Sequence, residues 1–170
     1  MADQVELIPG VGAVLGGKTV RLGDTQADVE QALGVGENVR WTSLYYFASE
    51  LRVDFDGEGR VEFIELLGGP DGQLQPVIFG VKAFREPPEA VVELLKEKNG
   101  GEFVDNEHGY SYAFQKLSVG LYRESIPKNV DETIEEARAD GHPLSEEDIE
   151  YEKRRTHWAT IGVGAEGYYE

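Results

Sequence analysis

The chain has no cysteine in its 170 residues, and it has no long apolar run. Without cysteine there are no disulfide bonds and no thiolate chemistry. A membrane-crossing helix needs about 18 to 20 consecutive apolar residues, which no segment provides. The first residues, Met1 to Leu7, also lack the basic start and apolar core of a secretion signal. We therefore predict a cytoplasmic protein.

Basic side chains are also scarce. Lys and Arg together number 16 against 33 Asp and Glu, which gives a formal net charge of −17 at pH 7. A field of this sign repels nucleic acids and anionic membranes and attracts basic surfaces. The composition therefore predicts a basic protein partner and disfavours binding to nucleic acid or membrane.

Residues 129–152 hold about half of the excess negative charge. Ten carboxylates in that segment face a single cation, Arg138, for a formal charge of −9, and residues 1–128 carry another −9. The concentrated part is what a basic partner would recognise. A role in solubility alone, or adaptation to a salty habitat, stays open as an alternative.

Motifs for enzyme chemistry are lacking. The sequence has no Gly-x-Ser-x-Gly elbow, and its histidines, His108, His142 and His157, have no metal-ligand spacing. The glycines of 10–17 match neither the dinucleotide fingerprint nor the P-loop. We predict a non-enzymatic protein without a cofactor. An enzyme whose site forms between two repeats remains an alternative.

One spacing resembles a calcium loop. Asp54, Asp56, Gly59 and Glu65 fit loop positions 1, 3, 6 and 12, while Glu58 stands at position 5, where the pattern has Asp or Asn. A calcium loop of this class follows a helix, whereas residues 49–55 and 60–64 alternate like strands, which favours a β-hairpin with a glycine-rich turn. A calcium-binding or small-ligand domain is kept as the first alternative, ahead of the enzyme.

The order of predicted elements repeats along the chain. A strand at 18–22 leads to a helix that begins with a capping box at Thr25 and Asp28 and ends at Gly34; two alternating segments follow, at 51–55 and 61–63. A second series has a strand at 77–81, a helix at 87–98 and strands around 110–114 and 117–121. We predict an α+β fold of two tandem helix-plus-antiparallel-sheet units, residues 1–75 and 76–170.

Two apolar triplets support the repeat. In the helices, Val29, Ala32 and Leu33 match positions 91, 94 and 95, at an offset of 62. In the strands, Leu51, Val53 and Phe55 match positions 117, 119 and 121, at an offset of 66. The difference of four residues corresponds to one extra helical turn in the second unit.

The acidic segment 129–152 is predicted to be a helical insertion before the last strand. Asn129 with Glu132, and Ser145 with Asp148, have the spacing of two helix starts, and strand-like alternation returns at 157–163. Apolar positions in both helices are few, so most of their surface must face solvent or a partner. We select as partner contacts the glutamates Glu135, Glu136, Glu146, Glu147 and Glu150.

Aromatic residues precede the matched strand triplets in both units. They are Trp41, Tyr45, Tyr46, Tyr110 and Tyr112. Half-buried sheet packing is one interpretation. An exposed sheet face that presents Tyr45, Tyr110 and Tyr112 to a partner is the other, because tyrosine is a frequent interface anchor.

The lead segment resembles a recurrent bacterial pattern. It consists of a Pro-Gly turn at 8–12, a strand ending Leu-Gly at 20–23 and a short helix ending Leu-Gly at 33–34. With the hairpin 51–63, this is similar to the β-lactamase-inhibitor-protein-like architecture and to small outer-membrane assembly lipoproteins. The resemblance implies two helix-on-sheet units with a concave protein-binding surface.

A second resemblance is to acidic cytoplasmic immunity proteins of bacterial toxin systems, and the Tyr168-Tyr169 segment after Ile161-Gly162-Val163-Gly164 is typical of such bacterial proteins. This resemblance implies an immunity protein that neutralises a basic toxin, for instance a nuclease, by binding it. Carboxylates would then occupy the positions that substrate phosphates take.

Overall fold

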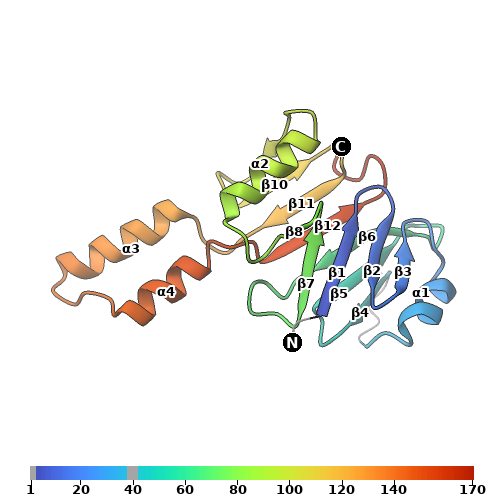
Figure 1. Cartoon of the computed structure of the whole chain (residues 1–170), viewed down its shortest axis with the longest axis horizontal. Helices are drawn as coiled ribbons and strands as arrows, with labels where there is room; N and C mark the ends of the chain where they lie inside the picture. Colours follow the sequence, from blue (N-terminus) through green and yellow to red (C-terminus); the bar gives the residue numbers. More distant parts are fainter. Residues whose placement is uncertain (1–2, 38–41) are drawn as a thin grey trace.

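The computed structural model describes residues 3–37 and 42–170; Trp41 lies outside them. In this part of the chain there are four helices: α1 (Gln26–Leu33), α2 (Pro88–Lys98), α3 (Pro127–Ala139) and α4 (Glu146–Arg154). The same part contains twelve strands: β1 (Asp3–Ile8), β2 (Gly12–Leu15), β3 (Lys18–Arg21), β4 (Ser43–Tyr46), β5 (Leu51–Phe55), β6 (Val61–Leu66), β7 (Leu74–Ile78), β8 (Val81–Lys82), β9 (Val104–Asp105), β10 (Ser111–Phe114), β11 (Val119–Tyr122) and β12 (Thr160–Gly164). The predicted α+β class is confirmed (Figure 1).

The strands form two sheets. The five-stranded sheet has the order β3-β2-β1-β7-β8, and the seven-stranded sheet has the order β4-β5-β6-β12-β11-β10-β9. Strands β1 and β7 pair in parallel, while the other pairs are antiparallel. Each sheet combines strands from both sequence units, so the two units share both sheets.

The order of elements recurs. A hairpin, a helix and three antiparallel strands follow one another as β2-β3-α1-β4-β5-β6. The series β7-β8-α2-β10-β11-β12 has the same order, with the short strand β9 added before β10 and helices α3 and α4 inserted before β12. The groups β4-β5-β6 and β10-β11-β12 join through β6 and β12, where Ile64 lies opposite Val163. Strands β5 and β11, which carry most of the matched apolar triplets, are the middle strands of the two groups.

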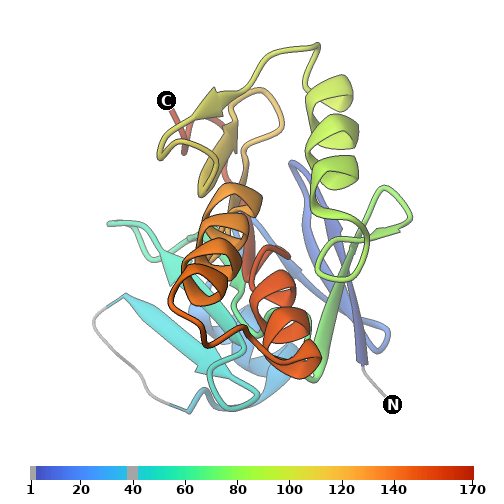
Figure 2. The ribbon, with the colours of Figure 1, turned by 90° about the vertical axis from the view of Figure 1, so that its left-hand side faces the viewer.

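The core lies between the sheets. Val5 and Leu7 of β1 belong to one continuous buried cluster with Ile64 and Leu66 of β6, and Leu95 of α2 joins them. Figure 2 shows the blue strands of the five-stranded sheet and α2 on one side of the molecule, away from the cyan strand of the seven-stranded sheet. The opposite face of the seven-stranded sheet, its open face, does not contribute to this layer.

Helix α1 begins where the capping box predicts. Thr25 Oγ1 accepts a hydrogen bond from the backbone N–H of Asp28 at 3.2 Å, and the Asp28 carboxylate accepts the backbone N–H of Thr25 at 3.0 Å. The helix ends at Gly34, whose φ of +86° favours glycine. Both predicted ends of α1 are confirmed.

The predicted strand at 77–81 is wrong in one respect. Instead of one strand, the segment is a hairpin: β7 ends at Ile78 and β8 begins at Val81. Phe79 and Gly80, with φ of +49° and +77°, form the two-residue turn between them. Positive φ at both turn residues matches the right-handed twist of the two strands.

The predicted acidic insertion before the last strand is confirmed. Helices α3 and α4 lie between β11 and β12 and project from the two sheets as a hairpin, shown at the left of Figure 1. We call residues 127–154 the acidic arm. Among the described residues, no helix is long and apolar enough to cross a membrane.

The start of α3 differs from the prediction. The helix begins at Pro127, with Ile126 as the capping residue, rather than at an Asn129 cap. The fixed φ of proline suits the first helical position, so the cap lies three residues earlier than predicted. The amide of Asn129 instead donates a hydrogen bond to the Tyr110 hydroxyl. The Ser145 cap of α4 is confirmed, because its hydroxyl accepts the backbone N–H of Asp148 at 3.1 Å.

Candidate functional site

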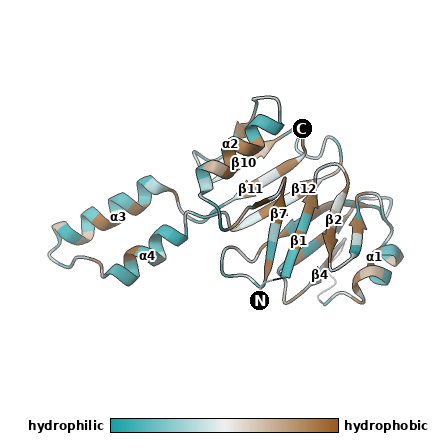
Figure 3. Ribbon diagram, in the orientation of Figure 1, coloured by the Kyte–Doolittle hydropathy of each residue, from teal (hydrophilic) through white to brown (hydrophobic). Residues whose placement is uncertain are grey.

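The acidic arm has very little apolar packing. Val130 is the buried residue of α3, and none of the nine residues of α4, all of which the structure describes, is buried. Ile134 of α3 and Ile149 of α4 are half-buried. Figure 3 shows the arm in mostly hydrophilic colours, in contrast to the strands of the core. Short helices without a buried face are only marginally stable in water, so covering the apolar positions of the arm would stabilise it.

Charge is distributed unevenly along the arm. The ten carboxylates lie within 129–152, while three of its four basic side chains, Lys128, Lys153 and Arg154, lie at the end attached to the sheets. In α4, three acidic residues occupy the first turn and two basic residues the last turn, an arrangement that the helix dipole stabilises. The projecting part of the arm is therefore strongly negative, and its attached end is not.

The five glutamates that the sequence selected all lie on the arm and are exposed. They are Glu135 and Glu136 of α3 and Glu146, Glu147 and Glu150 of α4. Glu135 is paired with Arg138 at 2.8 Å, an exposed contact that salt weakens. The other four form no ion pair with any residue that the structure describes. Their charge remains available to a basic surface.

Arg123, at the end of β11, anchors the arm to the sheets. Its side chain is only 3 % exposed. The guanidinium donates to the carbonyl oxygens of Gly109 at 2.9 Å and Thr156 at 3.1 Å, and it lies 4.6 Å from the centre of the Trp158 ring. Its one ion-pair partner among the described residues is Glu89, at 3.1 Å. Because residues on both sides of the arm meet this one side chain, Arg123 fixes the point from which the arm projects.

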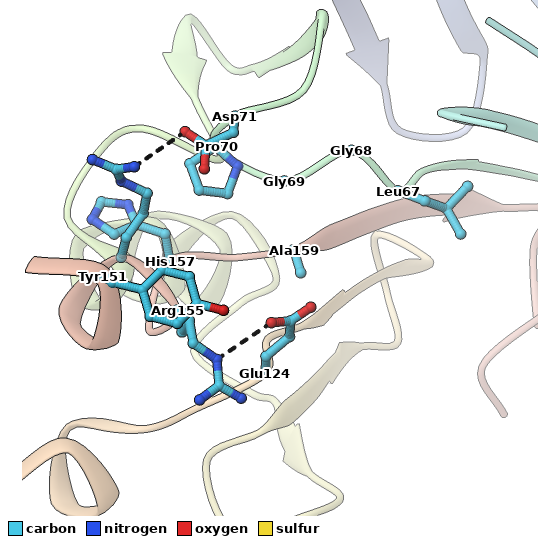
Figure 4. A pocket seen from close by; sticks show the side chains of 11 residues that line it. Leu67, Gly68, Gly69, Pro70, Asp71, Glu124, Tyr151, Arg155, His157 and Ala159 are labelled. Carbon is cyan, nitrogen blue, oxygen red and sulfur yellow. Dashed lines mark hydrogen bonds and ion pairs between the residues drawn. The ribbon is translucent and has the colours of Figure 1, made fainter. Parts of the chain in front are cut away.

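A pocket of about 180 Å³ lies beside this anchor, between the end of α4 and the glycine-rich connection from β6 to β7 (Figure 4). Arg154 pairs with Asp71 at 3.5 Å and Arg155 with Glu124 at 3.5 Å. His157 Nδ1 lies 3.1 Å from the carbonyl oxygen of Phe84. Ligand pockets usually measure about 300 to 1,000 Å³. The small volume and the pairing of both arginines indicate that this pocket serves to hold the arm and is not a ligand-binding site.

The three predicted tyrosines lie in three different environments. Tyr112 faces the core, where its ring packs edge-on against Trp158 at 5.6 Å. Tyr110 lies before β10 and contacts Asn129 of the arm. Tyr45 lies on the open face, opposite Arg52 of β5. Their alternation along the sequence therefore does not translate into one aromatic surface.

A different aromatic cluster occupies the open face. Segment 165–170 folds back over the seven-stranded sheet, where Tyr168 stacks on Phe63 with ring centres 4.5 Å apart. Tyr169 lies edge-on to both rings, at 5.1 Å from Tyr168 and 6.1 Å from Phe63. Tyr122 of β11 is also 41 % exposed. Apart from the resemblance at Tyr168 and Tyr169, no pattern in the sequence indicates a role for these residues.

Glycines in the central strands make room for this cluster. A β-carbon added at Gly120 would overlap Tyr169, one at Gly162 would overlap Phe63, and one at Gly164 would overlap Tyr168. Glycine inside a strand often marks a close approach by another group. The alternation Gly162-Val163-Gly164 was thus the sequence signal that could have revealed the aromatic contact.

The calcium spacing folds as a hairpin turn between β5 and β6. Asp54 and Glu65 face Arg52, at 3.2 Å from its Nε and 3.3 Å from its Nη2, while the Asp56 carboxylate accepts the backbone N–H groups of Glu58 and Arg60. Burial raises the pKa of Glu65 above its ordinary value, and the nearby Arg52 opposes that rise. Across residues 3–37 and 42–170, no three metal-binding side chains gather at one point.

Comparison of the chain with protein-family models, with curated proteins and with solved structures finds no match.

Proposed function

We propose that this chain is a non-enzymatic binding protein that inhibits a basic protein partner through its acidic arm. The partner is of the kind found in bacterial toxin systems, such as a basic nuclease, and the chain acts as its cytoplasmic immunity protein. The observation that carries the proposal is the arm itself: a strongly negative, projecting helical hairpin with almost no buried surface of its own.

The arm's geometry suits a stoichiometric inhibitor. Four exposed glutamates without an ion-pair partner in the described chain, Glu136, Glu146, Glu147 and Glu150, are carried on two helices that other parts of the protein leave uncovered. Rows of carboxylates can occupy the places of nucleic-acid phosphates in a basic cleft. The long-range field of the arm also raises the rate of association with a basic protein, by an amount that depends on ionic strength.

A role in solubility alone would not require this arrangement. Solubility is served by charges spread over the whole surface. Here the acidic arm concentrates ten carboxylates while its apolar positions remain poorly covered. Contact with a basic partner would bury those apolar side chains and neutralise the carboxylates at the same time. This double gain supports binding rather than solubility.

The test compares two variants that remove the same number of charges. The arm variant replaces Glu135, Glu136, Glu146, Glu147 and Glu150 by Gln. The matched control replaces five exposed glutamates outside the arm: Glu58, Glu93, Glu97, Glu107 and Glu166. Each form is immobilised, incubated with a lysate of the source organism at low salt, and eluted with a salt gradient.

We expect the unmodified chain and the control to retain one basic protein in stoichiometric amount, and the arm variant to lose it. For the purified pair, association should slow steeply with added salt in the unmodified chain and less steeply in the arm variant. Equal loss in both variants would show that only total charge matters. Unchanged retention by the arm variant would overturn the proposal.

A further inference from the structure

The open face of the seven-stranded sheet carries a groove of about 260 Å³. Its polar lining comes from neighbouring strands: Glu65 of β6, Thr160 of β12, Tyr122 of β11 and Ser111 of β10. Gly120 of β11 also lines it and lies opposite Gly162 of β12, which lies opposite Glu65. The two glycines leave room for the Tyr169 and Phe63 rings, which lie over them and form the aromatic part of the lining.

The sides of the groove are aromatic and polar. Tyr168 and Tyr169 both line it, with ring centres 5.1 Å apart and ring planes at 80°. Tyr122 lines it as well, between its cross-strand neighbours Ser111 and Thr160. Three phenol rings and the Glu65 side chain thus border one groove.

The charge of the groove is negative. Arg52 lies beside Glu65 but is held between two carboxylates, with its Nη2 3.3 Å from Glu65 Oε1 and its Nε 3.2 Å from Asp54 Oδ1. The group of three therefore has a formal charge of −1. The second carboxylate oxygen of Glu65, Oε2, has no ion-pair partner among the described residues and remains able to accept hydrogen bonds. An anionic ligand would meet both this charge and the net −17 of the chain.

We infer that this groove receives one arginine or lysine side chain of the basic partner. Aromatic rings around a cation, with a carboxylate beside them, are the features that bind guanidinium and ammonium groups. A volume below the usual range of about 300 to 1,000 Å³ for small-molecule pockets suits a single side chain. The inference rests on the proposed function, to which it adds a specific anchor away from the acidic arm.

The test uses acetyl-arginine amide as a probe and the full chain observed by NMR, with acetyl-glutamine amide as the neutral control. We expect saturable shifts of the Tyr122, Tyr168 and Tyr169 ring signals with the arginine probe and none with the glutamine probe. Glu65→Gln should weaken binding about tenfold, because a charge-assisted hydrogen bond is lost. Tyr122→Ser should weaken it about threefold, as expected for one exposed cation–π contact.

Tyr122→Phe serves as the conservative control, because it keeps the ring and should keep the affinity. Equal shifts with both probes, or unchanged affinity in Glu65→Gln and Tyr122→Ser, would overturn the inference. If those two variants still retain the basic partner in the lysate experiment as well as the unmodified chain does, the proposed function of the arm stands and the groove has no part in it. Loss of the partner in the arm variant tests the proposed function, and the two groove variants test the groove, so the two hypotheses can fail independently.

Discussion

Replacement of Arg123 by Met tests how the arm is held. The Met side chain keeps an unbranched apolar chain against Trp158 but removes every donor of the guanidinium. The carbonyl oxygens of Gly109 and Thr156, now 2.9 and 3.1 Å from Arg123, would lose their partner. Each orphaned carbonyl costs about 1 kcal/mol, and the lost cation–π contact costs about 1 kcal/mol more. We therefore expect a loss of about 3 kcal/mol in the free energy of unfolding.

The assay is urea denaturation followed by tryptophan fluorescence in a Trp41→Phe background. Trp158 is then the single fluorophore of its kind, and it is fully buried beneath Arg123. For a chain of this length, about 3 kcal/mol corresponds to a drop of about 9 °C in the melting temperature. Limited proteolysis in the same variant should cut more readily at the arm, because its attachment is weakened.

Glu89→Gln is the matched control. The Glu89 side chain is 62 % exposed, so its pairing with Arg123 is screened by water, and the variant should lose less than about 1 kcal/mol. If Arg123→Met lowers the free energy of unfolding by less than about 1 kcal/mol, water must replace the guanidinium as the hydrogen-bond donor to both carbonyl groups. If Glu89→Gln costs as much as Arg123→Met, the ion pair rather than the carbonyl contacts would be the main stabilising interaction. Either result would refute the reasoning.

Three further predictions concern single residues. Val130→Ala should destabilise α3 by about 2 kcal/mol, because two buried methyl groups are lost, and hydrogen exchange of the arm should accelerate while that of β5 stays slow. Gly162→Ala should lower the free energy of unfolding by about 1 to 3 kcal/mol in urea denaturation, because the new methyl group overlaps the Phe63 ring; an unchanged midpoint would show that the Phe63 ring moves aside freely. Hydrogen bonding to Thr25, first to its backbone N–H and then to its hydroxyl, lowers the pKa of the Asp28 carboxyl group below its ordinary value of 3.8. The ionised carboxylate therefore stabilises the folded state above pH 3.8. This stabilisation is lost as the pH falls through the lower pKa that Asp28 has in the folded state. Asp28→Asn should therefore be less stable than the unmodified chain at pH 7 and approach it near pH 2; a difference that stays constant with pH would contradict this assignment.

The parts of the fold that the sequence predicts are governed by local interactions. The capping box of Thr25 and Asp28 involves residues three apart, and Ser145 caps α4 in the same way. Alternation of Leu51, Val53 and Phe55 predicts β5 because a strand exposes successive side chains to opposite faces. These patterns involve only a few neighbouring residues, so they predict the elements without knowledge of the three-dimensional fold.

The open face depends on contacts between distant residues. The pairing of β6 with β12 brings Glu65 next to Gly162, and the return of segment 165–170 places Tyr169 over Gly120. No local pattern encodes those pairings. The same limitation explains Tyr112, whose alternation with Tyr110 is compatible with either face of a sheet until β10 is placed against Trp158. The acidic residues of the arm were easier to find, because their function would depend on charge density more than on neighbours.

The arm enters and leaves the sheets at directly paired positions. Tyr122 at the end of β11 lies opposite Thr160 at the start of β12, and the backbone N–H of Ala159 donates to the carbonyl of Tyr122 at 2.8 Å. Topologically the arm is an enlarged β-hairpin loop, and a short turn could close the same two strands. Changes within the arm, including replacement of the whole hairpin, would leave the strand pairing of the sheets intact. Under the proposed function, the part of the chain that contacts the partner can therefore change without any change in the sheets that carry it.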